Sequence, residues 1–191
     1  MLRYIVSGAP GAGKTVLVRA LRKLGYAVVD EAATDVIAWG QAGGDDEPWR
    51  GAGFVDAVAR VQRERQQQAT GVVQVFDRSP ICTLALARYS DRPVTAGLAA
   101  EVERVVAQGI YQRRVFFVRL LGFITPTAAR RIGLADSVRF ERFHEEAYRE
   151  YGFELVDVPA GTLEARVELV DGYLRAESLK EGSGRGRPCG S

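Results

Sequence analysis

The stretch GAPGAGKT, residues 8–15, decides the expected fold. It fits the pattern G-x-x-x-x-G-K-[ST] and lies between the apolar run Tyr4–Val6 and a helical segment that begins at Lys14. Glycines let the backbone wrap closely around a phosphate chain with its N–H groups pointing inward, and the helix N-terminus adds partial positive charge. The pattern therefore predicts a P-loop, which holds the phosphates of a nucleoside triphosphate, made of Gly8, Ala9, Pro10, Gly11, Ala12, Gly13, Lys14, Thr15 and Val16.

Two residues of this loop have predicted chemical roles. Lys14 is expected to reach the β- and γ-phosphates, and the hydroxyl of Thr15 is expected to ligate Mg²⁺. ATP and Mg²⁺ are therefore the expected cofactors. The chain contains no Asn, so it lacks the guanine-reading motif NKxD, and it has no LSGGQ signature. Both absences argue against the usual GTPases and against transporter ATPases.

The composition describes one ordinary globular domain. At 191 residues, with 47% hydrophobic and 26% charged residues, the chain can bury one core but is short for two. A formal net charge of +2 does not favour nucleic acid as a partner. Cys82, Cys189 and the single histidine, His144, are too few for a disulfide framework, a zinc site or a Ser-His-Asp triad.

The sequence does not predict an association with membranes. No apolar run approaches ~18 residues, the length that a membrane span needs. The N-terminal MLRYIVSGAP enters a strand directly and lacks the apolar core of a signal peptide. We therefore expect a cytoplasmic protein without a membrane partner.

Short apolar runs alternate with helical segments, which is the pattern of a parallel sheet covered by helices on both faces. The predicted fold is an α/β P-loop NTPase of the kinase-like class, with a five-stranded parallel sheet. The strand order, 2-3-1-4-5, is taken from that class. The expected strands are Tyr4–Val6, Tyr26–Val29, Val72–Phe76, Val115–Leu121 and Phe153–Val158.

Helices are expected between these strands, where apolar residues recur at helical spacing. One P-loop kinase-like domain is predicted for residues 1–176, and the polar, glycine-rich residues 177–191 are predicted to be a flexible tail. The expected helices are Lys14–Leu24, Ala32–Trp39, Phe54–Gln68, Ile81–Tyr89, Ala96–Ala107, Thr127–Arg131, Ser137–Tyr151 and Leu163–Ala176.

Two of the expected strands end in acidic residues, and the strand order assigns these acids different roles. The second strand ends in Asp30-Glu31 and the third in Asp77-Arg78. In the order 2-3-1-4-5 the third strand lies beside the first, so Asp77 would lie next to Thr15 and hold Mg²⁺. Glu31, on the outer strand, would face the acceptor side of the cleft and take the proton of an incoming hydroxyl. In a different strand order the two roles would not separate in this way.

The residues beside these acids favour the same assignment. A typical AAA+ hydrolase has a second acid directly after the strand-ending Asp to activate water, but here Asp77 is followed by Arg78. Arg78 would point into the cleft and steer the acceptor hydroxyl or the transferred phosphoryl group. Asp30 is expected to cap the helix that follows it, and Ser79-Pro80 are expected to begin the next helix.

Four stretches together resemble a known family: GAPGAGKT (8–15), VVDEAATDVI (28–37), VFDRSPICTLALARY (75–89) and FHEEAYREYGFELVDVP (143–159). They are similar to the AAA-type P-loop ATP-binding domains that include the nicotinamide riboside kinase domain and, more distantly, to the deoxynucleoside kinases. The resemblance covers about residues 3–174. The resemblance implies that Glu31 is the base. In the deoxynucleoside kinases a Glu-Arg-Ser sequence contacts the sugar hydroxyl and the metal, and Asp77-Arg78-Ser79 occupy those places here, with Asp instead of the longer Glu.

An arginine-rich segment follows the fourth expected strand. In P-loop kinases the matching region, about residues 125–148 here, is a lid that closes over the nucleotide and brings arginines to the developing charge. Closure excludes water, which a kinase needs in order to avoid hydrolysing ATP. The candidate arginines are Arg130, Arg131 and Arg139. The alternative is a solvated helix face on which acidic residues pair with the arginines.

Other polar and aromatic residues are expected to be structural. His144 has no predicted catalytic partner. Trp39 and Trp49 are expected to lie in the core or anchor the loop after the second strand, and the alternative is that one of them stacks on a substrate ring. Gln62 and Gln66–Gln68 lie on the helix 54–68; one of them could face an acceptor pocket, but the triplet 66–68 is expected to be solvated.

Two functions remain open on these residues. The first is a kinase that transfers the γ-phosphoryl group of ATP to a hydroxyl of a small, nucleoside-like acceptor. The second is a nucleotide-dependent switch or ATPase that binds a protein partner. A nucleic-acid-binding protein with a residual P-loop is disfavoured because no basic stripe lies outside the lid. The expected partners are a nucleoside triphosphate and a small-molecule acceptor, and a homodimer stays open.

Overall fold

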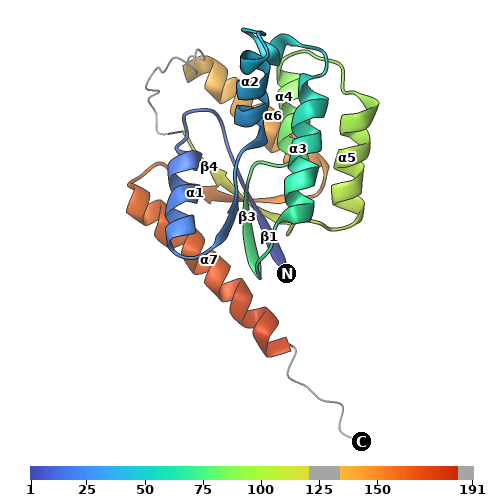
Figure 1. Cartoon of the computed structure of the whole chain (residues 1–191). Coiled ribbons are helices and arrows are strands. Elements are labelled where there is room, and N and C mark those ends of the chain that lie inside the picture. Colours follow the sequence, from blue (N-terminus) through green and yellow to red (C-terminus); the bar gives the residue numbers. More distant parts are fainter. Residues whose placement is uncertain (121–133, 185–191) are drawn as a thin grey trace, which may run out of the picture.

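The computed structural model of the chain describes residues 1–120 and 134–184. Its strands form one five-stranded parallel sheet in the order β2-β3-β1-β4-β5, which confirms the predicted order (Figure 1). The fourth strand ends at Val118 rather than at Leu121. The strands are β1 (Leu2–Ser7), β2 (Ala27–Val29), β3 (Val73–Asp77), β4 (Arg114–Val118) and β5 (Glu154–Val158).

The helices begin close to their expected positions, and two of them, α3 and α5, have the predicted bounds. α2 continues past Trp39 to Ala42. α7 continues past Ala176 to Gly184, so part of the expected flexible tail is helical and extends beyond the sheet (Figure 1). The helices are α1 (Lys14–Lys23), α2 (Ala32–Ala42), the 3-10 helix η1 (Pro48–Arg50), α3 (Phe54–Gln68), α4 (Pro80–Tyr89), α5 (Ala96–Ala107), α6 (Leu134–Glu150) and α7 (Leu163–Gly184).

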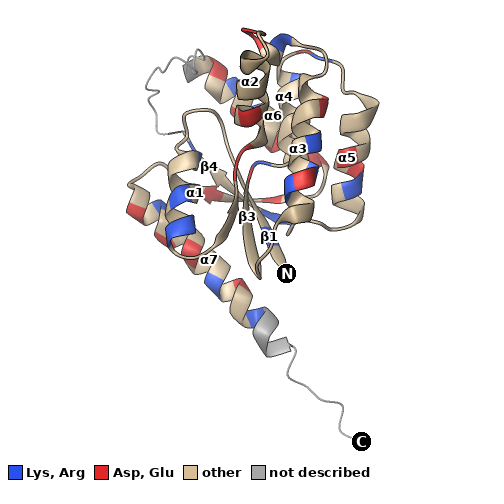
Figure 2. Ribbon diagram, in the orientation of Figure 1, with Lys and Arg blue, Asp and Glu red and all other residues tan. Residues whose placement is uncertain are grey.

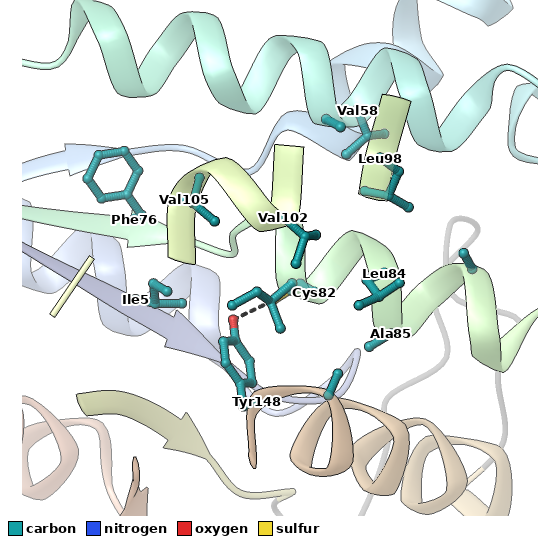
Figure 3. Packing of buried hydrophobic residues seen from close by; sticks show 14 of the residues in the cluster. Ile5, Val58, Phe76, Cys82, Leu84, Ala85, Leu98, Val102, Val105 and Tyr148 are labelled. Carbon is teal, nitrogen blue, oxygen red and sulfur yellow. Dashed lines mark hydrogen bonds between the residues drawn. The ribbon is translucent and has the colours of Figure 1, made fainter. Parts of the chain in front are cut away.

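Alternating side chains of the strands divide the core between the two faces of the sheet, because successive residues of a strand point to opposite faces. On one face, Ile5 and Phe76 pack with buried residues of α3, α4, α5 and α6 (Figure 3). On the other face, Val6, Val75 and Phe116 pack with α1 and α7. The sheet is therefore fixed from both sides, which holds the ends of its strands in place.

The helix α6 belongs to this core. Its residues Phe140, His144, Ala147 and Tyr148 are buried, and it packs against α4. The part of the expected lid that lies in α6 therefore packs one face against the core, while its other face is exposed. The rest of the expected lid, including Arg130, Arg131 and the expected helix Thr127–Arg131, lies outside the described residues.

The parallel register brings the ends of three strands together. Val6 of β1 pairs with Asp77 of β3, and Val29 of β2 pairs with Phe76. Parallel strands all end at the same edge of a sheet, where ligands of such folds bind. The P-loop, the Asp30-Glu31 pair and Arg78 therefore meet at this edge.

One prediction about the helix starts at this edge is wrong. Glu31, not Asp30, occupies the N-cap position of α2, and no side chain accepts a capping hydrogen bond there. Asp30 instead pairs with Arg22 on the surface, at 2.7 Å. Ser79 and Pro80 begin α4 as predicted, but the Ser79 hydroxyl lies 2.9 Å from the hydroxyl of Tyr148 rather than capping the helix.

Basic and acidic residues are interspersed along the helices (Figure 2). This arrangement agrees with the small net charge of +2. None of the helices in residues 1–120 and 134–184 combines the length and the apolar character that crossing a bilayer requires.

Gly8 lies where the P-loop passes against β4. Its φ is +136°, and a Cβ added there would lie 2.3 Å from the carbonyl oxygen of Val118. Gly25 also has a positive φ, +94°, but among the described residues no atom lies within 4 Å of its Cβ position. A side chain at Gly25 would therefore cost only the unfavourable backbone conformation, whereas one at Gly8 would also clash with Val118.

We predict that Gly25→Ala lowers the free energy of unfolding by about 1–2 kcal/mol, the cost of a left-handed conformation for a residue with a side chain. Gly8→Ala is expected to lower it further, because the clash with Val118 is added to the same conformational cost. Urea unfolding of both variants beside the wild type measures the difference. Equal losses in the two variants would contradict the close packing of the P-loop on β4.

Candidate functional site

The P-loop joins β1 to α1 with a backbone shape that its glycines allow. Gly8, Gly11 and Gly13 have φ values of +136°, +87° and +88°, a region that side chains disfavour. The helix α1 begins at Lys14, so its first N–H groups have no partners within the helix. These donors and the positive end of the helix dipole form an anion site.

Lys14 is buried at the base of this loop. Its Nζ donates hydrogen bonds to the carbonyl oxygens of Gly8 (2.9 Å) and Ala9 (2.8 Å). Burial lowers the pKa of Lys14 to about 8, and the nearby positive charge of Arg78 lowers it as well. An anion in the loop would oppose both effects, because it favours the charged form of the amine.

A small cavity of about 520 Å³ opens beside the P-loop, and Thr15, Glu31 and Asp77 all line it. Thr15 is exposed in the first turn of α1, whereas Asp77 is only 5% exposed at the end of β3. The Oδ1 atom of Asp77 has no hydrogen-bond partner in the described part of the chain. Burial raises the pKa of this carboxyl group despite the charge of Lys14.

These residues fit Mg²⁺, which the P-loop fold implies. A buried carboxylate oxygen without a partner and an exposed hydroxyl on the same cavity are hard oxygen ligands, and Mg²⁺ takes such ligands together with phosphate oxygens and water. A cation there would also compensate the charge of Asp77, which burial disfavours. Thr15 and Asp77 would hold it.

Arg78 is the residue directly after β3, and its backbone is unusual. Its φ is +76°, although it is not a glycine. Its Nε forms an ion pair with Glu31 Oε1, and the side chains of Arg78 and Glu31 are 12% and 28% exposed. On its other side, Nη1 lies 3.5 Å from His144 Nε2, and the guanidinium lies 6.0 Å from the centre of the Phe140 ring. Two different elements therefore hold the guanidinium in one orientation.

Glu31, which follows β2, connects the end of that strand to the end of β3 through its ion pair with Arg78. Its second oxygen accepts a hydrogen bond of 3.1 Å from the Thr34 hydroxyl. Burial alone would raise the pKa of Glu31, but the charges of Arg78 and Lys14 outweigh it and lower this pKa below its usual value. Glu31 is therefore ionised at neutral pH.

The contact between His144 and Arg78 was missed from the sequence. His144 is fully buried, and its Nδ1 lies 2.9 Å from the carbonyl oxygen of Phe140. A carbonyl only accepts, so Nδ1 carries the proton. Burial and the charge of Arg78 lower the pKa of His144 well below 6.5, so the ring is neutral and Nε2 is an acceptor toward Arg78. The only signal in the sequence is the spacing of four residues from Phe140, which places both on one helix face.

A large cavity of about 1190 Å³ is lined by both members of the Arg78–Glu31 pair. Four aromatic side chains line it: Trp49, Phe54, Tyr89 and Phe140. Its charged lining residues balance, since three acids and three arginines contribute: Glu31, Asp46, Glu47, Arg50, Arg78 and Arg92.

The glutamines of α3 separate into different environments. Gln62 lines the large cavity, and its Oε1 accepts a hydrogen bond of 2.9 Å from Thr83. Gln66 is also buried and accepts a hydrogen bond from Arg104, so the prediction of a solvated triplet is wrong for Gln66, whereas Gln67 and Gln68 are exposed. Trp49 lines the large cavity, whereas Trp39 is 59% exposed and does not.

A buried polar network links the strand ends of the site to two helices beneath it. The hydroxyl of Tyr148 lies 2.9 Å from Ser79 Oγ and 3.0 Å from Cys82 Sγ, and Cys82 Sγ lies 3.3 Å from Ser7 Oγ. Figure 3 shows Tyr148 of α6 reaching Cys82 of α4 within the core. The network ties the ends of β1 and β3 to α4 and α6.

Of the three predicted lid arginines, only Arg139 is among the described residues. It lies exposed on α6, and its guanidinium lies 5.4 Å from the ring centre of Tyr89 and 5.7 Å from that of Phe143. Tyr89 lines the large cavity, so Arg139 lies near the rim of that cavity.

Comparison with known proteins places this geometry in a family. A search by sequence among curated proteins finds no match. Among solved structures, the deoxyadenosine kinase from M. mycoides with bound products dCMP and a flexible dCDP matches with a TM-score of 0.59 and 18% identity, over 92% of this chain and 100% of that chain. The same enzyme with bound dATP matches with a TM-score of 0.58 and 17% identity, over 91% of this chain and 100% of that chain.

These structural matches agree with the strand order and show that the chain has the P-loop fold of that kinase. A family model described as "AAA domain" matches residues 3–166, which is most of the chain. The chain therefore belongs to this AAA domain family of P-loop proteins.

Proposed function

We propose that this protein is a kinase that transfers the γ-phosphoryl group of ATP to a hydroxyl of a small, nucleoside-like acceptor. One observation carries the proposal: Glu31 lies on both cavities, with Thr15 and Asp77 on the small cavity and Arg78 on the large one. A carboxylate between the predicted Mg²⁺ ligands and a pocket that can hold an organic molecule is where a phosphoryl acceptor needs a base.

The large cavity supports an organic acceptor rather than water alone. Its volume of about 1190 Å³ far exceeds what a hydrolytic water needs and is slightly above the roughly 300–1,000 Å³ that small-molecule sites usually have. Its aromatic lining residues suit a flat ring, and its balanced charges suit an acceptor without net charge. A nucleoside has both properties, with a ring at one end and a hydroxyl at the other.

Each group has a role in the transfer. The acceptor hydroxyl gives its proton to Glu31 as its oxygen bonds to the γ-phosphorus, and the bond from that phosphorus to the β–γ bridging oxygen breaks, releasing ADP. The P-loop N–H groups and Lys14 bind the phosphates, and Thr15 and Asp77 hold Mg²⁺. Arg78 directs its charge to the acceptor hydroxyl or the transferred group.

The setting of Arg78 supports this role. Because His144 is neutral, it orients the guanidinium without cancelling its charge. Only Glu31 pairs with Arg78 as a counterion in the described residues. The charge of Arg78 is thus partly available to a phosphoryl group. We also propose roles in charge stabilisation for Arg130, Arg131 and Arg139, as the resemblance to P-loop kinases implies.

The structural matches support the nucleoside-like class of acceptor. The M. mycoides kinase of the same fold is described with bound dATP, and with the products dCMP and dCDP. The similarity to nicotinamide riboside kinase domains stays a prediction, so pyridine ribosides belong among the acceptors to be tested. Hydrolysis of ATP at a rate that no acceptor changes would favour the alternative, a switch ATPase with a protein partner.

We predict that Glu31→Gln lowers kcat for phosphoryl transfer by about 100- to 10,000-fold, the usual contribution of a general base. The Kd for ATP should stay unchanged, because Glu31 is not a P-loop residue. ADP release in the presence of the most stimulating nucleoside, with ATP binding measured by calorimetry, tests both statements.

The matched control for this test is Asp30→Asn, which removes the neighbouring carboxylate that pairs with Arg22 on the surface. It should lose far less activity than Glu31→Gln. Equal turnover in wild type and Glu31→Gln would remove Glu31 as the base.

We predict opposite effects of Asp77→Asn on stability and on activity. Burial disfavours the charge of this carboxylate, so the neutral amide should raise the free energy of unfolding when Mg²⁺ is absent. The same change should lower Mg²⁺-dependent turnover, because a cation ligand is lost. Unfolding in EDTA and a Mg²⁺ titration of turnover measure the two effects. A variant that is less stable and equally active would show a structural role only.

A further inference from the structure

Arg166 of α7 lies behind the P-loop and is only 4% exposed. Its guanidinium donates to three carbonyl oxygens: Nη1 to Ala12 (2.6 Å), Nε to Pro159 (2.9 Å) and Nη2 to Arg119 (2.9 Å). These carbonyls belong to the P-loop and to the residues directly after β5 and β4. One side chain therefore ties the P-loop to two strand ends and to α7.

The fork shape of the guanidinium is what makes this three-way contact possible. Arginine presents five N–H donors in a fixed plane, whereas lysine presents a single point charge. In residues 1–120 and 134–184, Arg166 forms no ion pair with an acid, so its contacts are these backbone carbonyls. Its position is thus set by backbone geometry rather than by a partner charge.

The contact with Ala12 fixes the direction of a neighbouring N–H group. The carbonyl of Ala12 and the N–H of Gly13 belong to one peptide plane, and no peptide bond in the described residues is cis. In a trans peptide the two groups point in opposite directions. Because the carbonyl points toward Arg166, the Gly13 N–H points away from it, and among the described residues no acceptor takes this N–H.

This peptide needs such an anchor. Gly13 has a φ of +88°, and glycine moves between backbone conformations at little cost. A flipped peptide would turn a carbonyl, instead of an N–H, toward the phosphates. A side chain at this position would crowd the anchor, because a Cβ would lie 3.3 Å from Nη1 of Arg166.

We propose that Arg166 is a positioning residue for triphosphate binding: it holds the Ala12–Gly13 peptide so that the Gly13 N–H faces the β- and γ-phosphates. Arg166 does not touch the nucleotide in this role and acts through the loop. The inference rests on the proposed binding of a triphosphate in the P-loop, but it is independent of the acceptor and of the base.

The test compares nucleotide binding by wild type, Arg166→Met and Arg166→Lys in the full chain, measured by calorimetry with ATP and with AMP. Loss of a hydrogen bond from a charged group predicts an increase of about 10- to 100-fold in the Kd for ATP. The Kd for AMP should stay within about twofold, because its single phosphate does not reach the Gly13 N–H. Arg166→Lys should lose nearly as much as Arg166→Met, since an amine cannot span three carbonyls.

The control is Arg175→Met on the same helix, which removes an exposed arginine that pairs with Asp171. It should bind ATP as the wild type does. A second readout uses the amide signal of Gly13 in ¹H–¹⁵N spectra, which should shift on adding ATP to the wild type and shift far less in Arg166→Lys. Urea unfolding identifies variants that have lost the fold, and the milder lysine variant then carries the test.

Three outcomes would overturn the inference. ATP binding within twofold of the wild type in a folded Arg166 variant would show that the loop does not need this anchor. Equal losses for ATP and AMP would show general damage rather than positioning of the phosphate chain. Full binding by Arg166→Lys would show that charge alone suffices. A wild type that binds no ATP would instead overturn the proposed function.

Discussion

The ion pair between Arg78 and Glu31 is the contact on which the rest of the site depends. It joins the residue after β3 to the N-cap position of α2, and its members are 12% and 28% exposed. Arg78 reaches the pair with a φ of +76°, a conformation that costs about 1–2 kcal/mol for a residue with a side chain. Strain of this kind persists where surrounding contacts enforce it. Both members of the pair line the large aromatic cavity, and Glu31 also lines the cavity beside Thr15.

Several groups near this pair are held in states that the protein alone disfavours. Burial lowers the pKa of Lys14 to about 8 and raises the pKa of Asp77, whose Oδ1 has no partner among the described residues. A triphosphate would favour the charged form of Lys14, and a cation would compensate the charge of Asp77. In the free protein, the hydrophobic clusters on the two faces of the sheet offset the free energy that the burial of Lys14 and Asp77 costs. Ligands that bind only the folded state then add stability, as mass action requires.

Local patterns explain how much of the molecule could be predicted from the sequence. The P-loop pattern sits between a strand and a helix, and the bounds of α3 and α5 follow from helical spacing between loop residues. The strand order came from the kinase class, and it brought Asp77 and Thr15 to one cavity. The N-cap of α2 was predicted one residue too early. Asp30 and Glu31 are adjacent acids, and the sequence does not show which of them takes the N-cap position between β2 and the helix. The helical extension of α7 was missed because glycine and charged residues resemble a tail.

The contacts that escaped prediction join distant parts of the chain. His144 meets Arg78 across 66 residues, and Arg166 meets Ala12 across 154 residues. Periodicity does not show such pairings, and arginine is so frequent in this chain that no single arginine is conspicuous. The lone histidine was interpreted as structural because no residue near it in the sequence forms a catalytic pair with it. In the fold its ring lies between the carbonyl of Phe140 and the guanidinium of Arg78. Both contacts depend on the packing of α6 and α7 against the sheet, which only the folded chain provides.

The most direct measurement follows the γ-phosphoryl group itself. ATP labelled at the γ-phosphorus is incubated with the protein, Mg²⁺ and a panel of nucleosides and pyridine ribosides, and the labelled products are separated. The account predicts that the label moves to the hydroxyl of an organic acceptor, with little inorganic phosphate formed. Label found only in inorganic phosphate, at a rate that no member of the panel changes, would contradict it.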